Sequence, residues 1–97
     1  MLVSLDWKDL NHAKQMLSIA ASAHNLNPEE GLRSIDANTV PDLLTEFDEW
    51  LQKHSYRFLH FDSKSDNYEG FIIESDHLAE VMKIANLLRI RTSLKHF

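Results

Sequence analysis

The sequence predicts an α+β fold, a single domain in which helices cover one face of a small, mostly antiparallel sheet. Three observations lead to this prediction. Apolar residues recur at helical spacing in three stretches, two β-type runs are separated by a short polar turn, and a shorter strand-like run lies near each end of the chain. With 97 residues, of which 43% are apolar and 26% charged, the chain has the size and composition of one domain over residues 1–97.

The first part of the chain is expected to form a strand, a helix and a partly helical connection. Residues 2–5 form the strand, and Asp6 is placed to cap the helix that follows, with Asp9 near the N–H groups of its first turn. This helix ends near residues 25–27, and the connection with one short helical piece begins at Pro28. The apolar face of the helix is expected to consist of Leu10, Ala13, Leu17, Ala20 and Ala21.

The clearest helical pattern starts at Thr39, a good N-cap residue two positions before Pro41. One face of this helix is apolar and is expected to lie against the core. The opposite face carries regularly spaced carboxylates, which are expected to form an exposed acidic stripe. The apolar residues are Leu43, Leu44, Phe47, Trp50 and Leu51, and the acidic stripe is Asp42, Glu46 and Glu49.

Two β-type runs, residues 56–62 and 68–74, predict a hairpin. Aromatic and β-branched residues favour the strands, and the short polar side chains between them can hydrogen-bond to turning backbone. The residues expected to stabilise the hairpin tip are Asp62, Ser65, Asp66, Asn67 and Tyr68.

The last helix is expected to be capped by Ser75 or Asp76 and to be followed by an edge strand over residues 90–94. Ile84 and Leu87 lie outside its apolar stripe, so they either widen the core contact or form a surface for self-association. The full order, β-α-(α)-α-β-β-α-β, resembles the split β-α-β arrangement of ferredoxin-like folds with one extra helix. The apolar stripe of the last helix consists of Leu78, Val81, Met82, Ala85 and Leu88.

Charge is unevenly distributed along a chain whose net charge is −5. Residues 29–49 contain seven carboxylates and one basic residue, Arg33, whereas no carboxylate follows Glu80. The acidic balance argues against a nucleic-acid partner, and no apolar run has the length of a membrane span or the flanks of a signal peptide. The lack of cysteine excludes disulfides and thiolate chemistry, and the expected location is cytoplasmic. The basic side chains near the C-terminus are Lys83, Arg89, Arg91 and Lys95.

No group of residues has the spacing of a catalytic or metal site, and no cofactor is predicted. His60 and Asp62 point to the same side of a strand and could form a three-ligand set with His77 or Glu74. An isolated histidine on a strand is, however, far more often a hydrogen-bonded or exposed residue. The loop from Asp62 to Asp66 has neither the glycine nor the closing glutamate of a calcium loop.

Three short motifs carry a resemblance to a known family. They are the Asp-x-x-Ser-Asp-x-Tyr turn within the run from Phe61 to Tyr68, the Leu78-xx-Val81-xxx-Ala85-xx-Leu88 pattern of the last helix, and the early Asp6-Trp7-Lys8. They resemble a family of small bacterial domains of unknown function, domain of unknown function 6630, mainly over residues 56–92. Members of that family typically have glycine where Arg89 stands in this chain. The resemblance implies no activity and supplies no catalytic residues.

These observations favour a non-enzymatic protein-interaction module. The first hypothesis is self-association as a homodimer, through Ile84 and Leu87 of the last helix or through an exposed strand edge. The alternative is an immunity-type or antitoxin-like protein whose acidic stripe neutralises a basic protein partner. A small hydrolase-like or metal-binding enzyme is the least favoured hypothesis.

Overall fold

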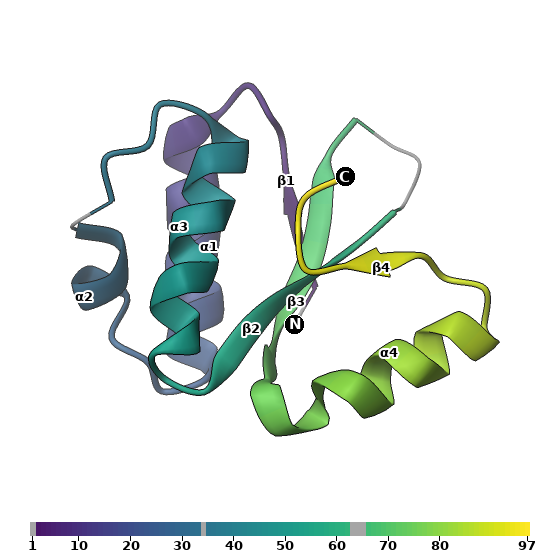
Figure 1. Ribbon diagram of the computed structural model, residues 1–97. Helices are drawn as coiled ribbons and strands as arrows, with labels where there is room; N and C mark the ends of the chain where they lie inside the picture. The colour runs from purple at the N-terminus through teal and green to yellow at the C-terminus, as the bar shows by residue number, and fades with distance from the viewer. Residues whose placement is uncertain (1, 34, 63–65) are drawn as a thin grey trace.

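The elements of the computed structural model follow the predicted order, and the α+β class is confirmed (Figure 1). The structure describes residues 2–33, 35–62 and 66–97, and for Arg33 it describes the backbone alone. These ranges contain four α-helices and one four-stranded sheet. The elements are β1 (Val3–Leu5), α1 (Leu10–Ala23), α2 (Pro28–Arg33), α3 (Val40–Gln52), β2 (Tyr56–Phe61), β3 (Tyr68–Glu74), the 3₁₀ helix η1 (Ser75–His77), α4 (Leu78–Leu87) and β4 (Thr92–Ser93).

The sheet is antiparallel throughout and has the strand order β1-β3-β2-β4. The hairpin register places Phe58 opposite Ile72 and His60 opposite Gly70. Because β3 lies between β1 and β2, these three strands form the predicted split β-α-β unit. The last strand differs from a ferredoxin-like sheet, in which it would lie beside the first. Here β4 pairs with β2, with Ser93 opposite His60.

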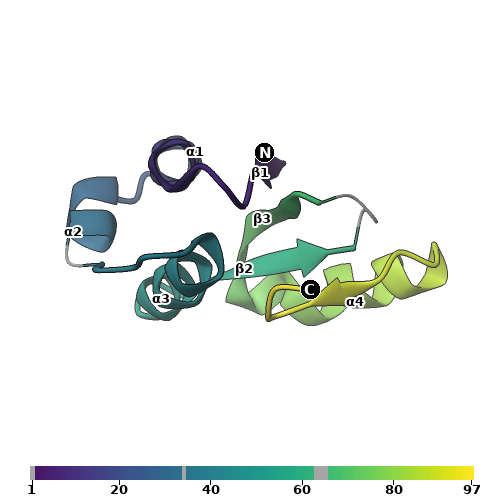
Figure 2. The ribbon, with the colours of Figure 1, turned by 90° about the horizontal axis from the view of Figure 1, so that it is seen from above.

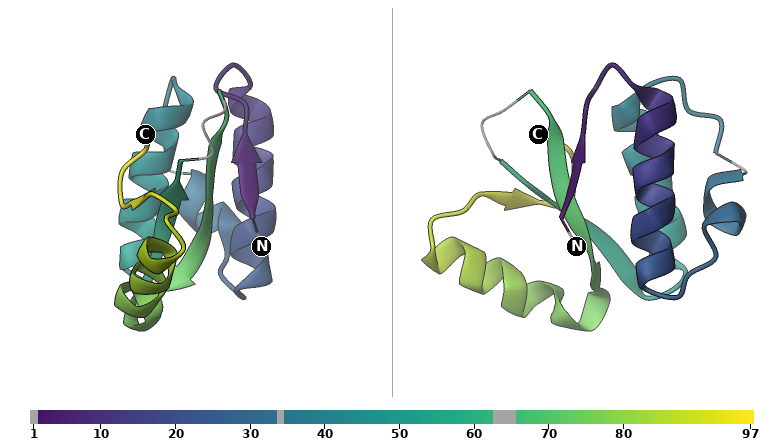
Figure 3. Two further views of the ribbon diagram at one scale, coloured as in Figure 1. Left: turned by 90° about the vertical axis from the view of Figure 1, so that its right-hand side faces the viewer. Right: turned by 180° about the vertical axis from the view of Figure 1, so that it is seen from behind.

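Helices lie on both faces of the sheet, whereas the sequence predicted cover on one face (Figure 2). α1 and α3 lie side by side on one face, and α4 lies on the other (Figure 3). Successive residues of a strand point to opposite faces, and both central strands carry buried apolar neighbours, Phe58 and Leu59 in β2 and Ile72 and Ile73 in β3. A sheet that is apolar on both faces needs cover on both, which explains the position of α4.

The main core fills the space between the layer of α1 and α3 and the sheet face that carries Phe58. The predicted apolar faces of both helices are confirmed, apart from Leu10, which is half-buried. Fully burying one large apolar side chain contributes about 1.5–3 kcal/mol, so this layer supplies most of the apolar stabilisation. Its buried residues are Val3, Leu5, Ala13, Leu17, Ala20, Ala21, Ala37, Val40, Leu43, Leu44, Phe47, Trp50, Leu51, Phe58 and Ile72.

The N-cap predicted for the first helix is wrong by three residues, whereas that of α3 is confirmed. α1 is capped by Asp9, whose Oδ1 accepts the backbone N–H of His12 at 2.9 Å. Asp6 accepts a backbone N–H within the preceding turn instead. An aspartate serves either position equally well, so the sequence did not distinguish them. At α3, Thr39 Oγ1 accepts the N–H of Asp42 at 3.2 Å.

The predicted cap of the last helix is also wrong. η1 precedes α4, and no side chain of Ser75 or Asp76 caps either element. The backbone N–H of Ser75 donates instead to the carbonyl of Ser55 at 2.9 Å. The start of η1, which leads into α4, is therefore bonded to the connection between α3 and β2, which is distant in sequence.

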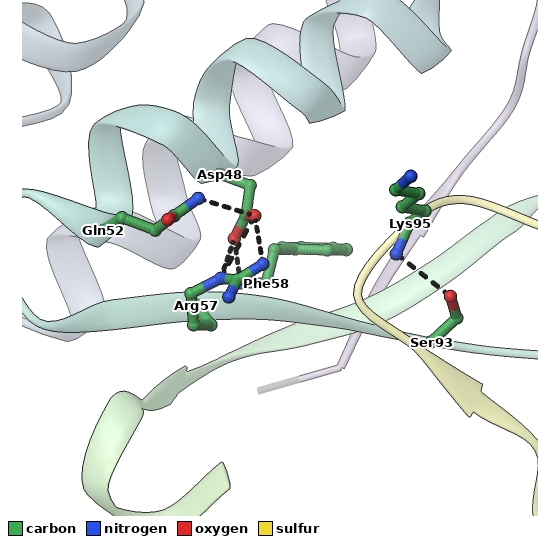
Figure 4. A network of polar contacts seen from close by, with 6 residues as sticks. All are labelled: Asp48, Gln52, Arg57, Phe58, Ser93 and Lys95. Atoms are coloured by element: carbon green, nitrogen blue, oxygen red, sulfur yellow. Dashed lines mark hydrogen bonds and ion pairs between the residues drawn. The ribbon is translucent and has the colours of Figure 1, made fainter.

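Asp48 joins α3 to β2 through a group of hydrogen bonds (Figure 4). Its carboxylate accepts Arg57 Nε at 3.1 Å, Arg57 Nη2 at 2.9 Å and the Phe58 N–H at 2.8 Å. Gln52 Nε2 donates to the same group at 3.3 Å. The Asp48 side chain is buried, and these charge-assisted bonds offset the loss of its hydration. The next residue, Glu49, is exposed.

α4 and its C-cap residue Leu88 are followed by a left-handed residue, Arg89, with φ 60°. The N–H of Ile90 then donates to the carbonyl of Ala85 at 2.9 Å, which closes the helix end. α1 ends in the same way at Asn25, with φ 61°. Asparagine tolerates this conformation, whereas for arginine it costs about 1 kcal/mol or more because Cβ crowds the backbone.

Asp48→Ala is expected to lower the free energy of unfolding by about 3 kcal/mol, because Arg57 and the Phe58 N–H lose their acceptor in a buried position. Urea denaturation measures the loss. Glu49→Ala, which removes the adjacent exposed carboxylate, should change the free energy by no more than about 0.5 kcal/mol. Equal losses in the two variants would contradict the role assigned to Asp48.

Arg89→Gly is expected to raise the free energy of unfolding by about 1 kcal/mol, since glycine adopts positive φ without steric cost. Arg89→Ala removes the same side chain but keeps Cβ, so it should bring no gain. Denaturant midpoints of the two variants measure the difference. A glycine variant no more stable than the alanine variant would show that the backbone conformation is not the cause.

Candidate functional site

Large apolar side chains are exposed at the end of α4 and in the turn that follows. Leu87 is 74% exposed and Leu88 66%, the two highest values among the described large apolar residues. Ile84 and Ile90 are about half exposed, and α4 buries Ala85 alone. No described helix combines the length and the apolar character needed to cross a membrane. Ile84, Leu87, Leu88 and Ile90 are called the α4 patch below.

A cavity of about 330 Å³ separates α4 from the sheet next to this patch. Leu59, Phe61 and Phe71 form its sheet side, and Val81 and Ala85 lie on its helix side. The rings of Phe61 and Phe71 are 5.6 Å apart, and both are only half-buried. α4 therefore rests on the sheet without closing over it, and apolar surface stays open beside the helix.

The structure places the two residues singled out on the last helix, Ile84 and Leu87, in solvent. Leu88, predicted to be buried with the apolar stripe, is instead largely exposed. α4 ends at Leu87, so Leu88 is the C-cap residue and no longer follows the helical spacing. Ile90 was not singled out at all. The apolar residues on either side of Arg89 are the sequence signal that could have indicated a continuous patch.

The free edges of the sheet are short. β1 has three residues and β4 has two, and each pairs on one side only. Each covers only part of the strand beside it, because β1 pairs with residues 68–70 of β3 and β4 pairs with His60 and Phe61 of β2. Of the two routes to a homodimer predicted from the sequence, the helix is the one that carries exposed large apolar side chains.

The acidic stripe lies on α3, away from the α4 patch. Asp42 and Glu49 are exposed, and Glu46 is half-buried. None of the three forms an ion pair with another described residue. The stripe is therefore a solvated helix edge whose charge is not compensated within the described chain.

The described part of the hairpin tip contacts other elements. Asp62 Oδ2 accepts Arg91 Nη1 at 3.2 Å, next to β4. Asn67 Nδ2 donates to Ser4 Oγ at 3.2 Å, on β1. The tip is thus linked to both edge strands. The other predicted tip residues are Tyr68, which is half-buried, Asp66, which is exposed, and Ser65, which lies outside the described residues.

His60 is a buried polar residue that sequence analysis did not connect with Asp48. It lines two cavities, one of about 370 Å³ near Trp7 and one of about 330 Å³ that also contains Asp48. Its ring lies edge-on to Phe58, with centroids 4.8 Å apart. The imidazole makes no hydrogen bond to another described residue. Figure 4 shows the chain from Ser93 to Lys95 across from the Asp48 network that borders the second cavity.

Burial lowers the pKa of His60 from its usual 6.5 to about 4. The nearby His96 lowers the pKa further, and Asp48 opposes the shift. The imidazole is therefore neutral near pH 7. In this form it has one hydrogen-bond donor and one acceptor available to a molecule in either cavity.

The structure does not assemble the three-ligand set considered for His60. His60 pairs with Gly70, whereas Glu74 pairs with Tyr56 four residues further along the hairpin. At about 3.3 Å per residue these positions are too far apart to share an ion. His77 lies near Glu74, with Nδ1 3.7 Å from Oε2, at the same distant end. No three histidine, aspartate or glutamate residues of the described ranges could together hold a metal ion.

Comparison with known proteins gives a family and no activity. The family model described as Domain of unknown function (DUF6630) matches residues 1–95, nearly the whole chain. No curated protein matches the chain, and no solved structure matches it.

The low pKa of His60 predicts that the protein loses stability in mild acid. Between pH 6.5 and 4 the unfolded chain binds a proton that the folded state does not, so this loss develops as the pH falls below 6.5. His60 should make the free energy of unfolding about 2 kcal/mol lower at pH 5 than at pH 7.5. His60→Gln should remove this part of the pH dependence. If the glutamine variant does not fold, an NMR titration of the wild-type imidazole decides, and a pKa near 6.5 contradicts the prediction.

Proposed function

This chain belongs to the family described as Domain of unknown function (DUF6630), and we propose that it is a non-enzymatic interaction module that forms a homodimer through the α4 patch. The observation that carries the proposal is the exposure of α4, which buries one residue and leaves Leu87 and Leu88 largely in water. Contiguous exposed apolar side chains mark protein contacts, because covering them removes apolar area from water.

The solvent-accessible surface of the chain is larger than expected for a monomer of its mass, which supports a contact area left uncovered. A monomer of 11.3 kDa exposes about 5,700 Å² on the general scaling of surface with mass. This chain exposes 6241 Å². The excess, about 500 Å², is comparable with the roughly 800 Å² that each partner contributes to a stable interface.

The charges around α4 favour a second copy of the chain as the partner. The start of the helix is acidic, with Asp76 and Glu80 exposed, and its exit is basic, with Arg89 and Arg91 exposed. Two copies related by a two-fold axis can pack α4 antiparallel, which brings the acidic start of one helix near the basic exit of the other. This arrangement pairs opposite charges around an apolar centre.

The residues that line the cavity between α4 and the sheet, called the α4 groove here, favour binding rather than catalysis. Apart from Thr92, the described residues that line it are apolar. Such side chains exclude water and fit a partner surface, but they do not transfer protons or attack a substrate.

The double variant Ile84→Glu with Leu87→Glu tests the dimer. The wild type should have a mass near twice 11.3 kDa in light scattering coupled to gel filtration, and the variant should have the monomer mass because four carboxylates would face each other across the axis. The matched control is Ile19→Glu on α1, at a residue as exposed as Ile84, and it should remain a dimer.

Three results would contradict the proposal. They are a wild type that is monomeric at every concentration tested, a folded double variant that remains dimeric, and an Ile19→Glu variant that dissociates to the same extent. Far-UV circular dichroism of all three proteins confirms that the comparison is between folded chains. Raised salt should weaken the wild-type dimer modestly, since the charges lie at the rim of the contact.

A further inference from the structure

We propose that Arg89 of one copy of the chain pairs with Glu80 of the other, and that these two symmetric ion pairs set how the α4 helices align in the homodimer. The inference rests on the proposed dimer and deepens it, because it names the residues that fix the contact. Glu80 lies one helical turn before Ile84, the first residue of the α4 patch, and Arg89 lies near the other end of the patch. Both charged side chains are exposed.

Arg89 has a backbone conformation that an arginine does not favour. Its φ is 60°, in the left-handed region where Cβ crowds the backbone. Glycine adopts the same conformation without this steric cost. Strained backbone of this kind clusters at functional sites, where the strained residue is needed for its side chain. An arginine at this position therefore points to a use for its guanidinium group.

Neither Arg89 nor Glu80 finds an opposite charge within its own copy. Their side chains form no ion pair and no hydrogen bond with another residue of the described ranges. Glu80 lies in the first turn of α4, and Arg89 follows the end of the helix at Leu87. The helix rises about 10 Å between Glu80 and Leu87, so the two charges of one copy stand at opposite ends of α4. A second copy supplies the missing partner of each.

The spacing along α4 fits a two-fold contact. In an antiparallel pair of helices, residues equally far on either side of the two-fold axis come level with each other. Glu80 of one copy is level with Arg89 of the other when the axis passes next to Ile84. Leu88 then comes level with Val81 of the other copy, which lines the α4 groove. Packed helices lie about 8–10 Å apart, a distance that a glutamate and an arginine side chain together span.

A contact centred on Leu87, the most exposed residue of the α4 patch, lacks these ion pairs. Arg89 would come level with Ala85 of the other copy, and Glu80 would lie beyond the end of the other helix. Both charges would then border the contact without a partner. The pairing of Glu80 with Arg89 thus selects one alignment among those that apolar contacts alone permit.

Charge reversal tests the pairing. Glu80→Arg places like charges at both symmetric contacts, and so does Arg89→Glu, so each variant alone should raise the dissociation constant of the dimer at least about tenfold. A 1:1 mixture of the two variants restores opposite charges at both contacts, because one chain then contributes two arginines and the other two glutamates. The mixture should form a heterodimer with a dissociation constant within about threefold of the wild-type value. Sedimentation equilibrium measures each constant.

Glu49→Arg on α3 changes the net charge as Glu80→Arg does, at another exposed residue, and should leave the dissociation constant unchanged. A wild type that is monomeric at every concentration overturns the proposed dimer and this pairing with it. Single variants that associate as tightly as a dimeric wild type, or a mixture of folded variants that does not associate, overturn the pairing and leave the dimer in place.

Circular dichroism shows whether the reversed variants fold. If one of them does not, Glu80→Gln and Arg89→Gly remove each charge without reversing it, and each should raise the dissociation constant about twofold to fivefold. For Arg89→Gly this loss of affinity would accompany the relief of backbone strain, so a purely structural role of Arg89 does not predict it. A dissociation constant unchanged in both variants overturns the pairing.

Ile84→Cys tests the position of the two-fold axis. The chain has no cysteine, so a disulfide formed by this variant under mild oxidation joins two copies. The bond needs Cα atoms within about 7 Å, and only a residue beside the axis meets its own counterpart at that distance. Ile84→Cys should therefore crosslink at least about fivefold faster than Leu87→Cys, whose two copies lie about 8 Å apart along the helices. Faster crosslinking of Leu87→Cys would overturn the alignment.

Discussion

The position of α3 on the sheet depends on the carboxylate of Asp48. Apolar side chains alone permit a helix to slide over a strand at little cost, because dispersion contacts have no direction. A buried carboxylate that accepts from Arg57, Gln52 and the Phe58 N–H has one satisfactory position. Moving α3 by one residue would leave these donors and the charge without partners. The hydrogen bonds thus set the relation between helix and strand, and the core packs around it.

The same network determines the surroundings of His60. His60 lies two residues beyond Phe58, so both side chains point to the face of the sheet that α3 covers. Asp48 has its donors already, and it therefore gives His60 only part of the stabilisation that a free carboxylate would give to an imidazolium. Burial prevails, and the pKa of His60 falls to about 4. The result is a neutral group with unused hydrogen-bonding capacity between two cavities.

Sequence patterns predicted the features that depend on neighbouring residues, namely the apolar faces of α1 and α3 and the hairpin, whereas they left open whether Ile84 and Leu87 are buried or exposed. They did not predict the features that depend on distant partners. Asp48 and Glu49 are adjacent acids, and only the donor set on β2 distinguishes the buried one from the solvated one. The strand order could not be predicted either, because the spacing of residues along the chain does not show that β4 pairs with β2. Leu88 was misplaced because the helical period was extended one residue past the end of α4.

β2 contributes side chains to both faces of the sheet, because successive side chains of a strand point in opposite directions. Phe58 and His60 belong to the face covered by α1 and α3, whereas Leu59 and Phe61 point toward α4. The first face is covered by α1 and α3, and Asp48 joins α3 to β2 there. Two cavities lined by His60 remain on this side. The second face is covered by one helix that buries a single alanine, so apolar area stays exposed there. One strand therefore borders a polar cavity on one side and, on the other, the apolar groove that we propose contacts a second copy, and Phe61 lines both.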